Sequence, residues 1–338
     1  MNRLLIRLSL LCWVLHFLGA GCHSNVKAEL DRGNLSDDDL VALLPQGLDA
    51  VIDVDVAGLR QLDTAAGLLE LLPDAAQKSL YVVSDQPLFD FDALAVGLIG
   101  LATPAPEVVF IVRGGMERVR RERVFAGLQK LGTATEAEYH GLPLIENNAD
   151  QAAAMLTPRT AVYGSRHGVR QVIDNFRGDE EGARKQVELM RALSKAPRAK
   201  TGRPAVLMGV LLTPPLRDKL RQLELPEYGV DADYLALALA VGDGIDLIVV
   251  SGHKTLPSAQ DAGRSLKARA QSFGQRPALK FLGVEQFVQP LLAVAVPAGK
   301  NRATPELHLA YRLPGAELTD LLNRLKKLQL LREKLGGG

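Results

Sequence analysis

The chain of 338 residues is 47% hydrophobic and 23% charged, which is enough apolar material for two ordinary domains or one large one. Its 40 basic and 39 acidic side chains leave a net charge of +1, so no extended positive field is available to attract a polyanion. Aromatic residues make up 5% of the chain, and sugar-binding or single-strand-binding surfaces depend on exposed aromatic faces. We therefore expect no nucleic-acid partner, and glycan binding is disfavoured.

The N-terminal segment has the features of an export signal. Arg3 and Arg7 precede an apolar run over residues 8–18, which is too short to span a bilayer as a helix. The small residues at 19–21, Gly-Ala-Gly, then offer an extended backbone to a signal peptidase directly before Cys22. Cleavage there would leave Cys22 at the new N-terminus.

This segment resembles the type II signal peptide of bacterial lipoproteins, whose cysteine receives a diacylglyceryl group before cleavage and an amide-linked acyl chain such as palmitate after it. The leucine of that motif stands one place early here, at Leu18. The resemblance implies that residues 1–21 are a removed signal peptide, that 22–36 are a polar tether, and that lipidated Cys22 anchors the protein to a membrane of the cell envelope. His23, where Asp would retain a lipoprotein at the inner membrane, implies the outer membrane in a diderm host. An ordinary secretory signal and an uncleaved anchor are the alternatives.

Cysteine usage agrees with a lipid anchor. The chain has two cysteines, Cys12 inside the removable segment and Cys22 at its end, so the mature body holds no thiol for a disulfide, a metal ion or nucleophilic attack. Two or more acyl chains anchor a protein stably, whereas a single chain holds only marginally. We expect no cofactor and no metal ion.

Hydrophobic periodicity divides the first half of the body into strands and helices. In AVIDVDV the apolar residues Ile52 and Val54 alternate with Asp53 and Asp55, which predicts a half-buried strand. The predicted elements, in chain order, are a helix over 36–44, a strand over 50–56, a helix over 57–72, strands over 93–102 and 107–113, and a helix over 116–130.

The second half repeats this order. It has a strand over 205–212, a helix over 214–223, a hairpin over 234–250, a helix over 258–272, a strand over 306–313 and a long closing helix. In the first arm of the hairpin, leucines at 235, 237 and 239 face one side and alanines at 236, 238 and 240 face the other. We expect the helix over 258–272 to lie on the alanine side, since small side chains permit a close approach.

The pattern β-α-β-β-α thus occurs twice, and each unit resembles the ferredoxin-like arrangement, in which helices cover one face of an antiparallel sheet. The predicted fold class is α+β, with a first unit over 37–196 and a second over 204–338 that ends in the long helix. The body is also loosely similar to uncharacterised bacterial envelope proteins built from paired units of this kind. The basic, Gly- and Pro-containing stretch 195–204 is the predicted joint, the alternative being a surface loop of a single domain.

Two serine–histidine pairs are the closest approach to a catalytic motif. In YGSRHG, Ser165 and His167 lie two residues apart, where helical side chains do not face each other, so Ser165 is better explained as a helix cap. In SGHKT, Ser251 and His253 share one face of a strand end, but no acid nearby in sequence could orient the histidine. We assign no catalytic residues, and these four are the alternative if the protein is a hydrolase.

Metal ligation is likewise not indicated. DVDVAG begins like a calcium loop at Asp53, but Ala57 and Thr64 stand where that loop requires ligands, so we interpret it as part of a strand. His140, in a turn, and His308, on the polar side of a strand, are expected to be solvated or to make single hydrogen bonds. The histidines show no paired spacing typical of zinc sites.

The closing helix carries a leucine seam spaced at three and four residues. It packs on its own sheet or forms a partner surface, whose residues would be Leu318, Leu321, Leu325, Leu328 and Leu331. The sequence therefore predicts a lipid-anchored envelope protein of non-enzymatic binding or scaffolding type, whose partner is another envelope protein. The alternatives are a secreted serine hydrolase-like enzyme and a binder of a small apolar ligand in a cleft between the two units.

Overall fold

The computed structural model describes the chain in several stretches. They are residues 40–60, 91–114, 121–178, 182, 204–222, 232–241, 244–274, 292–298, 304–317, 320 and 323. The signal segment, the tether, residues 195–203 of the predicted joint at 195–204 and the leucines of the closing helix lie outside them. The chain forms two compact units, the first comprising residues 1–194 with 204–211 and the second residues 195–203 with 212–338.

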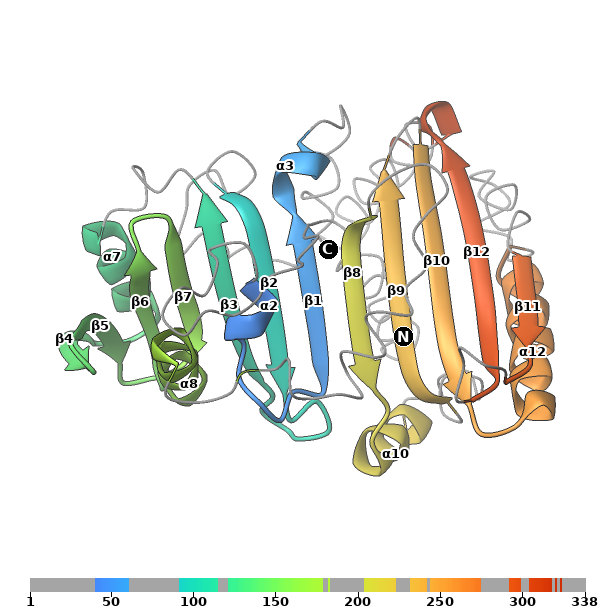
Figure 1. The fold of residues 1–338 in the computed structure, drawn as a ribbon, viewed down its shortest axis with the longest axis horizontal. Coiled ribbons are helices and arrows are strands. Elements are labelled where there is room, and N and C mark those ends of the chain that lie inside the picture. The colour runs from blue at the N-terminus through green and yellow to red at the C-terminus, as the bar shows by residue number, and fades with distance from the viewer. Residues whose placement is uncertain are drawn as a thin grey trace, which may run out of the picture. The chain divides into compact units, whose positions relative to one another are not determined.

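Within the described residues, eight strands belong to the sheet of the first unit, and Figure 1 shows their arrangement. Its strands are β1 (Ala50–Asp55), β2 (Phe91–Ile99), β3 (Glu107–Gly114), β4 (Ala134–Tyr139), β5 (Leu142–Asn147), β6 (Gln151–Thr157), β7 (Thr160–Ser165) and β8 (Pro204–Leu211). Their order across the sheet is β8-β1-β2-β3-β7-β6-β5-β4, and every neighbouring pair is antiparallel.

β1 lies in the interior of this sheet, between β2 and β8. Ile52 and Val54 are buried, whereas Asp53 and Asp55 are partly exposed, which confirms the predicted alternation. The strand ends at Asp55, whose side chain accepts a hydrogen bond from the Gly58 amide and so begins the short helix α3 (Val56–Leu59). This is the described part of the helix predicted over 57–72.

Two helices lie together on one face of the first sheet, in front of the strands in Figure 1. α2 (Leu40–Leu43) packs against β1 and β2, and α8 (Arg166–Arg177) packs against β3, β6 and β7. They are joined by Asn175, a buried residue whose side-chain amide donates to the main-chain carbonyls of Leu43 and Leu44, 3.0 Å away in each case. Asn175 thereby satisfies carbonyls that the end of α2 leaves without helical partners. α7 (Arg121–Leu131), the described part of the helix predicted over 116–130, packs against β4, β5 and β6.

The four strands β4 to β7 were not predicted. Their side chains do not show a clear alternation of apolar and polar residues: β4 exposes Glu136 and Glu138, and β6 is rich in alanine, which favours strands weakly. They form because three tight antiparallel pairings hold them in register, with Leu144 opposite Ala154 as one example. Because β7 pairs with β3, these hairpins extend the first sheet instead of ending it.

In the described part of the second unit, four antiparallel strands form a sheet. They are β9 (Ala232–Val241), β10 (Gly244–His253), β11 (Leu292–Val296) and β12 (Glu306–Pro314), in the order β11-β12-β10-β9. The helices described in this unit include α10 (Pro214–Gln222) and α12 (Leu256–Gly274). The predicted hairpin and the predicted strand at 306–313 are confirmed, whereas β11 was not predicted.

Helix α12 covers the leucine side of β9 and not the alanine side, so that expectation was wrong. Val249 on β10 packs with Leu307 and Leu309 against α12, and Leu237 lies directly opposite Val249 on the same face. The close approach comes from small residues on the helix itself. Ala259 and Ala262 are buried there, and a side chain on Gly263 would stand 3.1 Å from Leu307.

The ferredoxin-like fold class is contradicted. A split βαβ unit needs a crossover helix that brings two strands parallel, whereas β1 is followed by antiparallel β2 and then β3, like a meander. Eight strands in the first unit also exceed the three predicted for it. The contacts place β8 in the first unit, since residues 206–210 pair with 50–54 of β1, whereas the predicted second unit begins at Pro204.

We predict that Asn175→Ala lowers the free energy of unfolding of the first unit by about 2 kcal/mol, because two carbonyls at the end of α2 lose a buried donor. Chemical denaturation followed by circular dichroism measures this change. His167→Ala, at an exposed position of the same helix, is the matched control and should change stability by less than about 0.5 kcal/mol. Equal effects of the two substitutions would contradict the capping role of Asn175.

Candidate functional site

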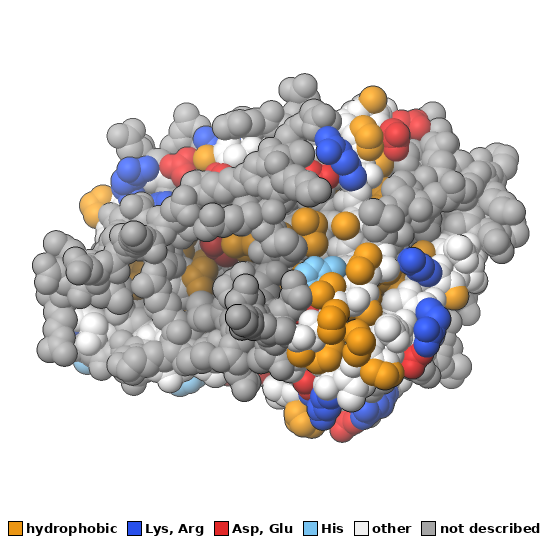
Figure 2. Space-filling model, turned by 45° about the vertical axis from the view of Figure 1, so that its right-hand side comes forward, with side chains coloured by type: hydrophobic (Ala, Val, Ile, Leu, Met, Phe, Trp, Pro, Cys, Tyr) orange, Lys and Arg blue, Asp and Glu red, His pale blue; other side chains and the backbone are white. Residues whose placement is uncertain are grey.

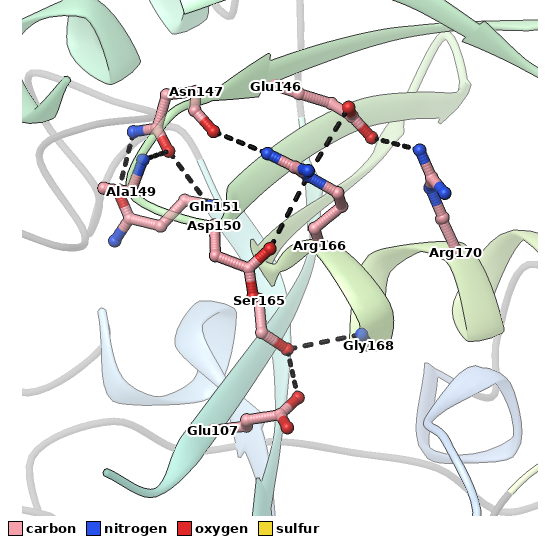
Figure 3. A network of polar contacts seen from close by, with 10 residues as sticks. All are labelled: Glu107, Glu146, Asn147, Ala149, Asp150, Gln151, Ser165, Arg166, Gly168 and Arg170. Carbon is pink, nitrogen blue, oxygen red and sulfur yellow. Dashed lines mark hydrogen bonds and ion pairs between the residues drawn. The ribbon is translucent and has the colours of Figure 1, made fainter. Parts of the chain in front are cut away.

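Ser165 stands at the junction of β7 and α8, where its hydroxyl has two partners (Figure 3). The oxygen accepts from the Gly168 amide at 3.2 Å, which makes Ser165 the N-cap of α8, and the hydroxyl donates to Glu107 on β3 at 2.7 Å. The predicted cap is confirmed. His167 is exposed, and the Ser165 hydroxyl bonds to Gly168 and Glu107.

Next to this cap, two arginines of α8 converge on one carboxylate. Arg170 donates to Glu146 on β5 at 2.7 Å, and the Nε of Arg166 lies 3.4 Å from the same side chain and 3.6 Å from Asp150. Arg170 also stacks over the ring of Tyr139 at 5.1 Å. These contacts fasten the hairpin strands to α8 through charged side chains that are partly exposed.

The turn between β5 and β6 is organised by Asn147, which is buried. Its side-chain oxygen accepts from the amides of Ala149 and Gln151, and its main-chain carbonyl accepts from Arg166 at 2.7 Å. The side-chain amide donates to the carbonyl of Leu128 on α7. Asn147 therefore joins two helices to one turn, and the network in Figure 3 has the character of a structural junction.

In the second unit, the other serine–histidine pair, Ser251 and His253, is in direct contact. The Ser251 hydroxyl and the Nε2 of His253 are 2.8 Å apart on β10, which is hydrogen-bonding distance for a nucleophile and its base. The third member is a hydroxyl, since Nδ1 of His253 lies 3.3 Å from the Oγ of Ser258 on α12. Ser251 is 2% exposed and His253 is fully buried. A substrate could reach this enclosed pair only if α12 moved. The hydrogen bonds of His253 instead help to hold α12 on the sheet.

A third cluster, which sequence reasoning did not find, lies on the opposite face of the same sheet. Glu306 is 3% exposed, and its carboxylate accepts from the hydroxyl of Tyr234 at 3.0 Å and contacts Nε2 of His308 at 2.8 Å. Gly252 stands between Tyr234 and Glu306 in the register, and any side chain there would collide with the Tyr234 ring. The sequence feature that could have indicated this cluster is the spacing of Glu306 and His308, which lie two residues apart and therefore on one face of β12.

The cluster orients the imidazole of His308, whose side chain is 31% exposed. A buried carboxylate bonded to one ring nitrogen fixes the orientation of the ring and the nitrogen that carries the proton. Glu306 and His308 supply two ligand-type side chains. In the part of the chain that the structure describes, no group of three or more His, Cys, Asp or Glu side chains could hold a metal ion.

One carboxyl group of the first unit, that of Asp53, has a strongly raised pKa. Burial raises the pKa of Asp53 to about 6, while a hydrogen bond from the Val54 amide and the charge of Arg113 lower it in part. Asp53 lies on the same face of β1 as Asp55, and Arg113 stands on that face of β3, across from Ala93. Asp53 therefore changes charge near neutral pH inside the sheet.

We predict that Asp53 makes the first unit less stable as the pH rises from about 4 to about 6. Its native pKa lies above the unfolded value of 3.8, so the native state holds the proton more tightly in this window, and stability falls as that proton is lost. Asp53→Asn should remove this slope and raise the free energy of unfolding at pH 7 by about 2 to 3 kcal/mol.

Denaturant titrations at several pH values measure this slope, and Asp261→Asn on the exposed side of α12 is the control that should retain it. A wild-type protein whose stability is level or rises between pH 4 and 6, relative to Asp53→Asn, would contradict the predicted pKa of Asp53.

Within the described residues, no helix is both long and apolar enough to cross a membrane. No protein-family model matches the chain, and neither the curated proteins nor the solved structures that were searched include a match.

Proposed function

We propose that this chain is a lipid-anchored protein of the bacterial cell envelope, held through Cys22, whose folded body binds or scaffolds another envelope protein without catalysis. The observation that carries the proposal is the position of Cys22, which follows the small residues 19–21 at the end of a short apolar segment. The only other cysteine, Cys12, lies within that segment. A cysteine kept at this place and nowhere in the body supports attachment of lipid.

The geometry of the candidate nucleophiles supports a binding role over hydrolysis. The Ser165 hydroxyl holds the start of α8 and bonds to Glu107, while His167 is exposed. Ser251 and His253 form the more suggestive pair, but both are buried under α12, and a serine takes the place of the orienting acid. These hydroxyl groups are used in packing and capping.

The location is tested by Cys22→Ser in the full chain, expressed in a diderm bacterium. We expect wild-type protein to sediment with membranes and to carry the intact-mass increment of a diacylglyceryl group and an acyl chain, because the Cys22 sulfur is the acceptor. Cys22→Ser should lose both properties. Cys12→Ser is the matched control and should keep them, since Cys12 leaves with the signal peptide. A mature wild-type mass without fatty acid would overturn the proposal.

The absence of hydrolase chemistry is tested with a fluorophosphonate probe, which labels an activated serine covalently. We expect no labelling of the full-length wild-type protein. Labelling that disappears in Ser165→Ala or Ser251→Ala, and in the corresponding His167→Ala or His253→Ala, would establish the hydrolase alternative. In-cell crosslinking with mass spectrometry, in wild type and Cys22→Ser, then identifies envelope proteins whose contact depends on the anchor.

A further inference from the structure

Strand β11 is the outermost strand of the second sheet among those that the structure describes. It pairs on one side with β12, from Leu292 opposite Ala310 to Val296 opposite Glu306. The main-chain N–H and C=O groups on the other side of such a strand are a template for an additional strand. Natural proteins usually protect an edge of this kind with charged side chains, proline or a bulge.

The two sheets differ in how they treat their edges. At the edge of the first sheet, β4 has the sequence ATEAEY and exposes Glu136 and Glu138. β11 has the sequence LAVAV, and no charged residue occurs between Glu285 and Lys300. The first edge therefore has the usual charged protection against pairing, whereas β11 carries no charge and has a proline only after its last residue, at Pro297.

β11 also presents an apolar side chain to solvent. Val294 is 59% exposed, and it is the only exposed large hydrophobic residue in the described part of the chain. Figure 2 brings this side of the molecule forward and shows hydrophobic side chains gathered at the surface beside a histidine, with basic side chains around them. The opposite face of β11 is covered, because Ala293 and Ala295 pack against α12.

The sequence of β11 is complementary to itself. Antiparallel pairing of two copies about Val294 puts Val294 opposite Val294, Ala293 opposite Ala295, and Leu292 opposite Val296. The β-branched Val294 and Val296 then lie on one face, and Ala293 and Ala295 lie on the face beneath α12. A two-fold axis at Val294 closes the assembly as a dimer, since each copy uses the same strand.

We propose that β11 joins two copies of this chain edge to edge, in an antiparallel pairing centred on Val294. The pairing makes the four-stranded sheet of the second unit continuous with that of its copy, and each α12 covers the same face of the joined sheet. Absence of charge on the strand and its self-complementary order favour a second copy over a different protein. This inference concerns the second unit alone and does not depend on lipid attachment at Cys22.

The register is tested by disulfide trapping in the full chain. Directly opposite residues of an antiparallel pair have Cα atoms about 4.5 to 5.5 Å apart, within the range that a disulfide bridges. We expect Val294→Cys to give a crosslinked dimer under mild oxidation in cells. Val296→Cys, on the same strand and face, should give none above wild type, because two copies of residue 296 would be four residues apart in register. Equal trapping at both positions, or at neither, would overturn the pairing about Val294.

Val294→Lys tests the interface without a disulfide. We expect the wild-type full chain, in detergent, to have the mass of two polypeptides by light scattering, and Val294→Lys to have the mass of one, because two like charges meet at the centre of the pairing. Glu136→Lys on β4 is the matched control at the other edge and should stay dimeric. A monomeric wild type, or a dimeric Val294→Lys with unchanged circular dichroism, would overturn the proposal.

Discussion

The antiparallel pairing of β1 with β8 determines how the chain is organised. Residues 50–54 and 206–210 are more than 150 positions apart in the sequence, yet they form neighbouring strands inside the first sheet. Because non-local pairing has a large entropic cost of chain closure, it needs compensation by burial, and Val51, Ile52 and Val54 are nearly inaccessible to solvent. The pairing means that the chain completes the first unit only after it has passed the basic stretch at 195–203.

Buried polar groups need hydrogen-bond partners, and this need explains the contacts that the candidate catalytic residues make. A helix that begins at the end of a strand has free amides in its first turn, and Ser165 supplies the acceptor for one of them. Under α12, His253 has a hydroxyl near each ring nitrogen, which lets an imidazole lie in a largely apolar layer. Serine and histidine near each other in a sequence thus have a structural explanation that requires no substrate.

The opposite treatment of the two sheet edges has a common physical origin. An edge strand must either repel other strands or be covered by one. The hairpin of β4 and β5 is polar on its outer strand and is fastened to α8 through Tyr139, Arg170 and Glu146. β11 is apolar and is held from the inside by α12 and β12. An edge strand without charge is most simply explained if it pairs with another strand in the assembled protein. For this reason we propose that β11 forms an interface.

The sequence by itself determined the local elements with strong periodicity, namely β1, β2, β3, β8, the β9–β10 hairpin and β12, together with the cap at Ser165. These depend on side chains a few residues apart. The export signal remains a prediction. The order of strands, the assignment of β8 to the first unit, the side on which α12 packs and the Tyr234–Glu306–His308 cluster depend on contacts between distant segments. Only the tertiary structure decided them, because the register between strands follows from packing and not from the spacing within any one strand.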